Sequence, residues 1–306
     1  MRRCALVLSV TLGLSACQEA SPPPEAPAPA AESAARPAAK PAARSELKPA
    51  ADARLGLLES CAAAEVEIER LRKAKPGTDW AAIAERFERC AFLVREVDRR
   101  HSLRYEEAIR AALKHCAAGA QPRVHQQTLA KGLQHVAVLA LQDELDALAA
   151  KDATLRAQAV ARAAAIYQGI RPTFIRRDKD FFAGTPTLAA AADQALEALR
   201  QAAPSGAAAA LGARRDLEDA ITRTYALSLL YEVQGIAKLR DTDRAACDVK
   251  KREAELFHAI IQPRLERRAP AADAALAAML AADYPAWDPA AAEANIQQGL
   301  PDVPLR

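Results

Sequence analysis

Apolar residues recur every three or four positions along most of the chain after residue 50, which is the spacing of one face of an α-helix. The first such segment, residues 54–74, stops at the turn sequence KPG, and Thr78 or Asp79 is placed to cap the next segment. Two antiparallel helices with so short a connection form a hairpin, which we expect over residues 54–101. Further helices are predicted over residues 103–117, 123–149, 154–178, 187–202, 208–239, 243–268 and 271–283.

The composition supports an all-α fold. Alanine, leucine, glutamate and arginine dominate the 306 residues, whereas aromatic residues make up only 4%. These four types are good helix formers. We therefore expect a multi-helix bundle of antiparallel hairpins over residues 51–306, with a C-terminal tail (284–306) that packs through Tyr284 and Trp287.

The chain also resembles itself at an offset of 91 residues. The sequences IRPTFIRR, from Ile170, and IQPRLERR, from Ile261, share an isoleucine, a proline, a large apolar residue and an arginine pair, and apolar positions upstream of them match as well. We interpret this match as an internal repeat of two related hairpins, residues 123–178 and 214–269.

The two prolines of this repeat, Pro172 and Pro263, are expected to kink or end a helix at matching places. Each proline is followed by a pair of arginines, and a forked guanidinium suits a phosphate, a sugar acid or a lipid head group. Cations near a helix C-terminus also complement its dipole without any ligand, which is the simpler alternative. The anion-binding candidates are Arg176, Arg177, Arg267 and Arg268.

The first 17 residues have a different pattern. Two arginines precede an apolar run from Ala5 to about Leu14, and small residues follow it immediately before Cys17. This order is typical of a secretory signal, and the run is shorter than the roughly 20 residues that a membrane-spanning helix needs.

The residues Leu14-Ser15-Ala16-Cys17 resemble the lipobox of bacterial lipoproteins. In that family a peptidase cuts before the cysteine, whose thiol receives a diacylglyceryl group and whose amine receives a third acyl chain. The resemblance implies that residues 1–17 hold a cleaved signal peptide with Cys17 as the lipidated new N-terminus and the link to the membrane. Gln18, where enteric inner-membrane lipoproteins have aspartate, implies an outer-membrane anchor facing the periplasm. The alternative is ordinary cleavage that leaves Cys17 free or disulfide-bonded.

Residues 18–50 are rich in proline and alanine and contain no aromatic residue. Such a segment buries too little apolar surface to fold, so we expect a disordered linker with polyproline II character. At about 3.1 Å per residue it could hold the folded part on the order of 90 Å from the membrane. The formal net charge falls from +3 to +1 when Arg2 and Arg3 leave with the signal peptide, which gives no reason to expect a nucleic-acid partner.

Export changes the meaning of the four remaining cysteines, because the periplasm is oxidising. Cys61 and Cys90 lie at the same height of the first hairpin, so we expect them to form a disulfide. Cys116 and Cys247 then remain as a second pair, although four cysteines allow three pairings.

Two carboxylate–imidazole pairs have the i, i+3 spacing that turns both side chains to one helical face: Asp98 with His101, and Glu255 with His258. Di-iron bundles use such motifs with further carboxylates, for which Glu144 and Glu232 are conceivable here. No cofactor is expected as the default, and a metal ion is the alternative. Ion pairing of Asp98 with the neighbouring arginines, and ordinary hydrogen bonds of His125 and His135, are the simpler interpretations.

The chain contains no HExxH, GxSxG, P-loop or dinucleotide-binding glycine pattern. An enzyme is therefore the less expected class. The sequence favours a membrane-tethered envelope lipoprotein that acts as a helical scaffold or binding module for an envelope protein or polymer. The alternatives are a periplasmic metal- or haem-binding bundle and an enzyme with an unfamiliar site.

Overall fold

A computed structural model describes residues 49–73 and 77–305, with side chains from residue 53 onward. Within these ranges the chain forms α-helices and three short 3-10 turns and no β-strand, so the all-α fold is confirmed. The signal peptide, Cys17 and almost all of the linker predicted for residues 18–50 lie outside the described residues. Among the helices that are described, none is long and apolar enough to cross a membrane.

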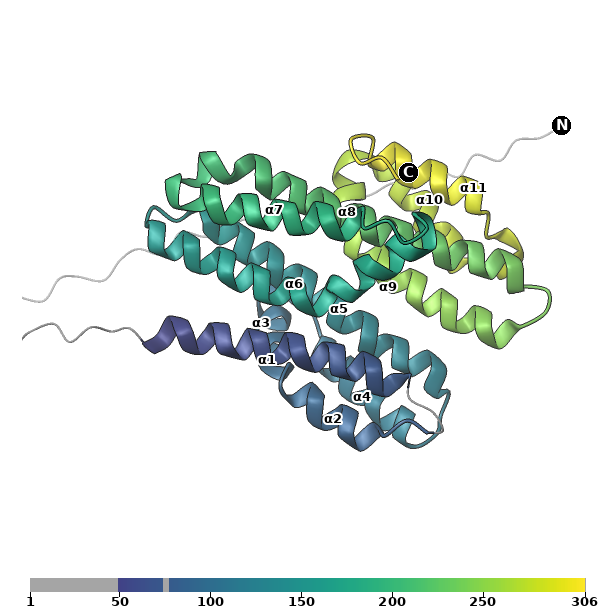
Figure 1. Ribbon diagram of the computed structural model, residues 1–306. Helices are drawn as coiled ribbons and strands as arrows, with labels where there is room; N and C mark the ends of the chain where they lie inside the picture. Colours follow the sequence, from purple (N-terminus) through teal and green to yellow (C-terminus); the bar gives the residue numbers. More distant parts are fainter. Residues whose placement is uncertain (1–48, 74–76, 306) are drawn as a thin grey trace, which may run out of the picture. The chain divides into compact units, whose positions relative to one another are not determined.

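The helices follow one another with short connections (Figure 1). Their bounds are α1 (Pro49–Arg72), α2 (Trp80–Glu88), α3 (Ala91–His101), α4 (Tyr105–Ala117), α5 (Pro122–Asp146), α6 (Ala153–Phe181), α7 (Leu188–Ala202), α8 (Ala207–Leu239), α9 (Arg244–Arg268), α10 (Pro270–Ala281) and α11 (Pro289–Gly299).

The first hairpin forms, with one difference from the prediction. Asp79 caps α2, because its carboxylate accepts a hydrogen bond from the backbone N–H of Ala82. The second helix of the hairpin is interrupted between α2 and α3, and Cys90 occupies the N-cap position of α3. A disulfide joins Cys90 to Cys61 on α1, which confirms this predicted pair.

The second predicted disulfide is wrong, because Cys116 and Cys247 are both free and buried. The Cys116 thiol lies at the end of α4, 3.6 Å from the backbone oxygen of Pro122. Cys247 lies in the first turn of α9. The next residue, Asp248, accepts a hydrogen bond from the hydroxyl of Tyr284. The two thiols therefore contact different elements.

The centre of the bundle is built from two long antiparallel pairs, α5 with α6 and α8 with α9. These pairs correspond to the two hairpins expected from the 91-residue offset. That the two hairpins are copies of one repeated unit stays a prediction. Both α6 and α9 continue through their prolines, Pro172 and Pro263, and do not end there. In the tail, Trp287 is fully buried and Tyr284 nearly so, and a helix that the sequence pattern did not predict, α11, follows them.

Candidate functional site

Helices α5, α8 and α9 line an open groove of about 840 Å³. From α9 it takes Ile260, Pro263, Arg264 and Arg267, whose spacing of three and four residues places them on one face of that helix. The apolar side chains at its base already belong to the core, because Ile260 is only 7% exposed and Val138 of α5 only 1%. A ligand would therefore meet mainly the polar side chains of the groove.

Five arginines line this groove, and three of them are bound to acids of the groove itself. Arg214 pairs with Asp146 at 2.7 Å and with Glu218 at 2.8 Å. The other two pairs are Arg264 with Asp219, and Arg268 with Asp302 at 2.7 Å.

The remaining two arginines of the groove, Arg215 and Arg267, are exposed. Neither has a hydrogen-bond or ion-pair partner among the residues that the structure describes. Because a guanidinium presents five N–H donors in a fixed fork, these two side chains can bind carboxylate or phosphate oxygens without breaking an internal contact.

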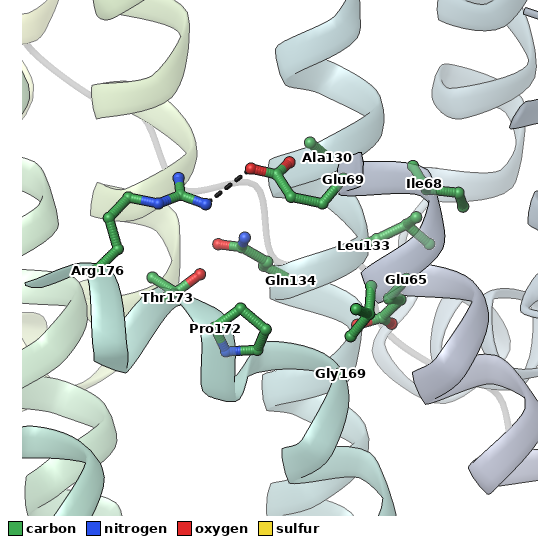
Figure 2. A pocket seen from close by; sticks show the side chains of 11 residues that line it. Glu65, Ile68, Glu69, Ala130, Leu133, Gln134, Gly169, Pro172, Thr173 and Arg176 are labelled. Atoms are coloured by element: carbon green, nitrogen blue, oxygen red, sulfur yellow. Dashed lines mark hydrogen bonds and ion pairs between the residues drawn. The ribbon is translucent and has the colours of Figure 1, made fainter. Parts of the chain in front are cut away.

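The four arginines predicted to bind anions thus have different surroundings. Arg267 and Arg268 line the groove, whereas Arg176 pairs with Glu69 of α1 at 2.7 Å (Figure 2). Arg177 is only 2% exposed; its guanidinium lies 4.3 Å from the ring centroid of Tyr231 and 3.2 Å from Asp180. The structure therefore does not bring the two pairs together into one site.

Arg176 lines a small cavity of about 30 Å³ between α1, α5 and α6 (Figure 2). Gln134, Thr173 and Pro172 also line it, and the buried Oε1 atom of Gln134 has no hydrogen-bond partner there. The cavity is large enough to hold water, which can donate a hydrogen bond to Gln134 Oε1.

The residues of the two predicted metal motifs lie apart, each with its own partner. Asp98 accepts hydrogen bonds from the backbone N–H groups of Tyr105 and Glu106, both at 2.8 Å, so it caps α4. His101 lies 3.3 Å from Asp143 and does not share a ligand position with Asp98.

The second motif is similarly divided. Glu255 pairs with Arg252 at 3.2 Å, and His258 lies 2.9 Å from Asp273 of α10. The further carboxylates are also engaged, because Glu144 pairs with Arg162 and Glu232 with Lys250. These residues are not gathered around a common point in the described part of the chain. A metal site made from them stays a prediction.

The two other histidines contact neighbouring rings. His125 stacks on His115, with ring centroids 4.4 Å apart, and His135 shares a hydrogen bond with the hydroxyl of Tyr105. Burial lowers the pKa of His135 to about 4, so this imidazole is neutral at physiological pH.

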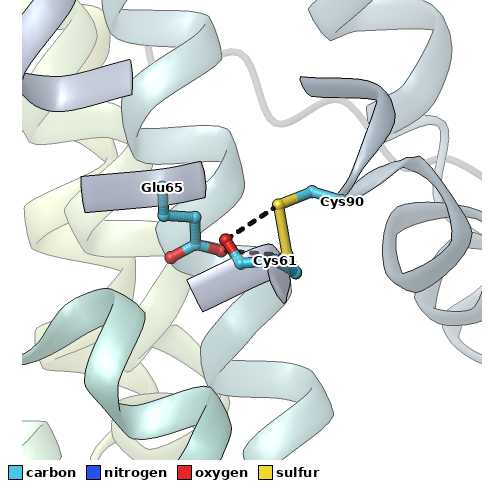
Figure 3. Close-up of side chains that lie close together, drawn as sticks. All are labelled: Cys61, Glu65 and Cys90. Carbon is cyan, nitrogen blue, oxygen red and sulfur yellow. Dashed lines mark hydrogen bonds between the residues drawn. A yellow bond between two sulfur atoms is a disulfide. The ribbon is translucent and has the colours of Figure 1, made fainter. Parts of the chain in front are cut away.

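A cluster with metal-ligand chemistry occurs at the disulfide. Atoms of Cys61, Glu65 and Cys90 lie within 4.8 Å of one another, and Glu65 Oε1 is 3.8 Å from the Cys61 sulfur (Figure 3). Both sulfurs are bonded to each other, so a metal ion could bind only after reduction to two thiolates. The oxidised cluster is therefore a structural link with a buried carboxyl group beside it.

Glu65 was not singled out from the sequence, although its i, i+4 spacing from Cys61 was a usable signal. Its carboxyl group fits between helices because residue 169 is glycine: a Cβ there would lie 2.3 Å from Glu65 Oε2. Burial raises the pKa of Glu65 to about 8, so the group is mostly protonated at neutral pH.

A set of buried charges was not predicted from the sequence. Lys131 of α5 is 1% exposed and lies 3.8 Å from Glu253 of α9, and burial lowers the pKa of its ammonium group. Burial, together with Glu253, raises the pKa of Glu232 to about 7. Lys131 lies in a stretch of α5 in which every residue from 127 to 133 is buried. The position of a lysine on an amphipathic helix normally indicates an exposed face, so the burial of Lys131 could not be predicted from the sequence.

Comparison of the chain with protein-family models, with curated proteins and with solved structures gave no significant match.

Proposed function

We propose that this protein is a lipid-anchored component of a bacterial cell envelope whose helical bundle binds an anionic partner and does not catalyse a reaction. The observation that carries the proposal is the groove between α5, α8 and α9, in which Arg215 and Arg267 are exposed and have no partner within residues 49–73 and 77–305. Unpaired guanidinium groups beside an open cavity recognise carboxylates and phosphates through forked hydrogen bonds.

The N-terminal sequence supplies the second support. The lipobox-like residues Leu14 to Cys17 would give a lipid anchor, and the proline-rich linker that follows would let the bundle reach a partner at a distance from the membrane. An outer-membrane anchor that faces the periplasm fits Gln18.

The alternative function, a metal- or haem-binding bundle, has less support. The four residues of the predicted metal motifs are each held by a separate neighbour, and the sulfurs of the Cys61–Cys90 cluster are joined in a disulfide. The groove, by contrast, offers donors that need no prior rearrangement.

The anchor is tested by expressing the full-length chain and its Cys17→Ser variant in a Gram-negative host. The wild type should fractionate with membranes and carry an acylated N-terminal peptide that begins at residue 17 by mass spectrometry, whereas the variant should carry no acyl group and should retain residues 1–16. A wild-type N-terminus without acyl chains, or an acylated Cys17→Ser variant, contradicts a lipid anchor at this residue.

Binding is tested with the lipid-free Cys17→Ser chain, expressed without residues 1–16, and a panel of fluorescent polyanions: polyglutamate, polyphosphate and dextran sulfate. At least one should bind with an affinity that falls with added salt, because exposed charges are screened. Binding should also weaken in the Arg215→Gln/Arg267→Gln double variant. If no polyanion binds, or if the double variant binds as the wild type does, the proposed binding function of the groove is wrong.

A further inference from the structure

The groove has a counterpart elsewhere in the same chain. Four residues of α6 line the small cavity of Figure 2, and the residues 91 positions later, all in α9, line the open groove. The matched pairs are Gly169 with Ile260, Pro172 with Pro263, Thr173 with Arg264, and Arg176 with Arg267.

The partner helices match as well. Ala130 of α5 lines the small cavity, and Ile221 of α8, again 91 positions later, lines the groove. In both places the proline lacks an N–H group, so the carbonyl four residues earlier loses its helical donor. The two sites are thus the same local construction, formed once by α5 and α6 and once by α8 and α9.

A third helix closes the first site. Helix α1 runs along α6 in the same direction, with Glu65 beside Gly169 and Glu69 paired with Arg176. The remaining cavity holds only about 30 Å³. The arginine that follows the proline is therefore paired with a glutamate of α1, whose carboxylate also pairs with Arg72 and Lys73.

The second site offers Arg267 no such carboxylate among the described residues. Helix α5 forms its third wall with Val138, Gln142 and Asp146, while the other acids of the groove, Glu218, Asp219 and Asp302, pair with Arg214, Arg264 and Arg268. Gln142 is uncharged, and Asp146 pairs with Arg214 at 2.7 Å. Arg267, the counterpart of Arg176, consequently remains exposed beside about 840 Å³ of open space.

From this difference we infer that the groove binds an acidic polypeptide segment of a partner protein, with a glutamate or aspartate of the partner on Arg267 as Glu69 lies on Arg176. Arg215 of α8, which lines the same groove, binds a second acidic side chain of the same segment. This inference rests on the proposed function and names the partner class of that groove. A polypeptide is favoured over a small anion because the chain itself fills the matching site with a glutamate on a helix, and because the groove is far larger than one phosphate needs.

The test measures the affinity of the lipid-free Cys17→Ser chain for a fluorescein-labelled polyglutamate of about 20 residues by fluorescence anisotropy. The double variant Arg215→Gln/Arg267→Gln should bind at least about tenfold more weakly, which corresponds to about 1.4 kcal/mol. Gln142→Glu should weaken binding as well, because it places a carboxylate of the chain itself at the groove, as Glu69 does in the first site.

Arg123→Gln is the matched control, because Arg123 is an exposed arginine with no side-chain partner among the described residues. It lies on α5, 19 residues and so about 28 Å along the helix from Gln142. Its affinity should stay within about twofold of the wild type, and unchanged thermal midpoints should show that all variants are folded.

Equal affinities of the wild type, the double variant and Gln142→Glu would overturn the inference, as would an equal loss in Arg123→Gln. Failure of polyglutamate, together with Arg267-dependent binding of polyphosphate or of phosphatidylglycerol vesicles, overturns the partner class but leaves the proposed anion-binding function intact. Failure of every polyanion and vesicle overturns both.

Discussion

Replacement of Glu65 by glutamine should change how the stability of the bundle depends on pH. Glu65 lies beside the Cys61–Cys90 disulfide, and its carboxyl group is packed against the backbone of α6 at Gly169. Burial raises its pKa from 4.5 to about 8. The folded chain therefore holds this proton at pH values where the unfolded chain has lost it.

The sign follows from proton linkage. Between pH 4.5 and pH 8 the folded state binds more protons than the unfolded state at this site, so the free energy of unfolding falls as pH rises through that window. At about 1.36 kcal/mol per pKa unit, the full effect is roughly 5 kcal/mol, of which about 3 to 4 kcal/mol develops between pH 5 and pH 8.5. Glutamine has nearly the same shape and cannot ionise, so Glu65→Gln should not lose this stability.

The assay is urea unfolding of the wild type and Glu65→Gln at pH 5 and pH 8.5, followed by far-UV circular dichroism. At pH 5 the two should differ by about 1 kcal/mol or less, the size of one ordinary hydrogen bond. At pH 8.5 the variant should be more stable by several kcal/mol. Glu59→Gln, which alters an exposed carboxylate of the same helix, is the control and should follow the wild type. If the difference between Glu65→Gln and the wild type is the same at both pH values, Glu65 is not a buried, protonated acid.

Gly169→Ala should destabilise the wild type by about 1 to 3 kcal/mol through its contact with Glu65, yet stabilise the Glu65→Ala chain by up to about 1 kcal/mol of helix propensity. A double-mutant cycle in urea should therefore give a coupling of at least about 1 kcal/mol, and additive effects would show that the two residues do not touch. Loss of the disulfide in a Cys61→Ser/Cys90→Ser chain should cost about 2 to 4 kcal/mol, given the 29-residue separation of the two cysteines. In the lipid-free Cys17→Ser chain without residues 1–16, thiol titration should find two reactive thiols in denaturant and close to none in the native state, because Cys116 and Cys247 are free and buried; no thiols in denaturant would mean that a second disulfide exists.

Much of the fold follows from local sequence signals. The helical spacing of apolar residues placed most helices to within a few residues, and Asp79 was one of the two residues predicted to cap α2. The Cys61–Cys90 disulfide could be predicted because both cysteines belong to one hairpin, whose short turn fixes which residues face each other.

Long-range packing could not be derived in this way. The predicted Cys116–Cys247 bridge assumed that two leftover cysteines meet, but their helices turn these side chains toward different neighbours. Likewise, the ion pair of Arg176 with Glu69 joins residues 107 positions apart, and nothing local to either residue indicates it.

The candidate site shows the same limit. The sequence identified Arg267 and Arg268 as anion-binding candidates from the repeated motif, whereas Arg215 was found only when α8 and α9 were seen to line one groove. Local sequence gives the type of side chain. Which arginines of the groove have an acidic partner in the described part of the chain depends on the acids that α5 and α8 bring there.

The most direct test of the account is photo-crosslinking in the envelope of cells that carry the native, lipid-anchored chain. A photoreactive amino acid at Gln142, in the groove, is compared with one at Arg123, at the far end of the same helix. If the groove binds an acidic partner through Arg267, position 142 should give an adduct whose crosslinked peptide is rich in glutamate and aspartate by mass spectrometry, and this adduct should disappear in the Arg267→Gln background. Adducts that are the same from both positions, or that persist without Arg267, would contradict this binding.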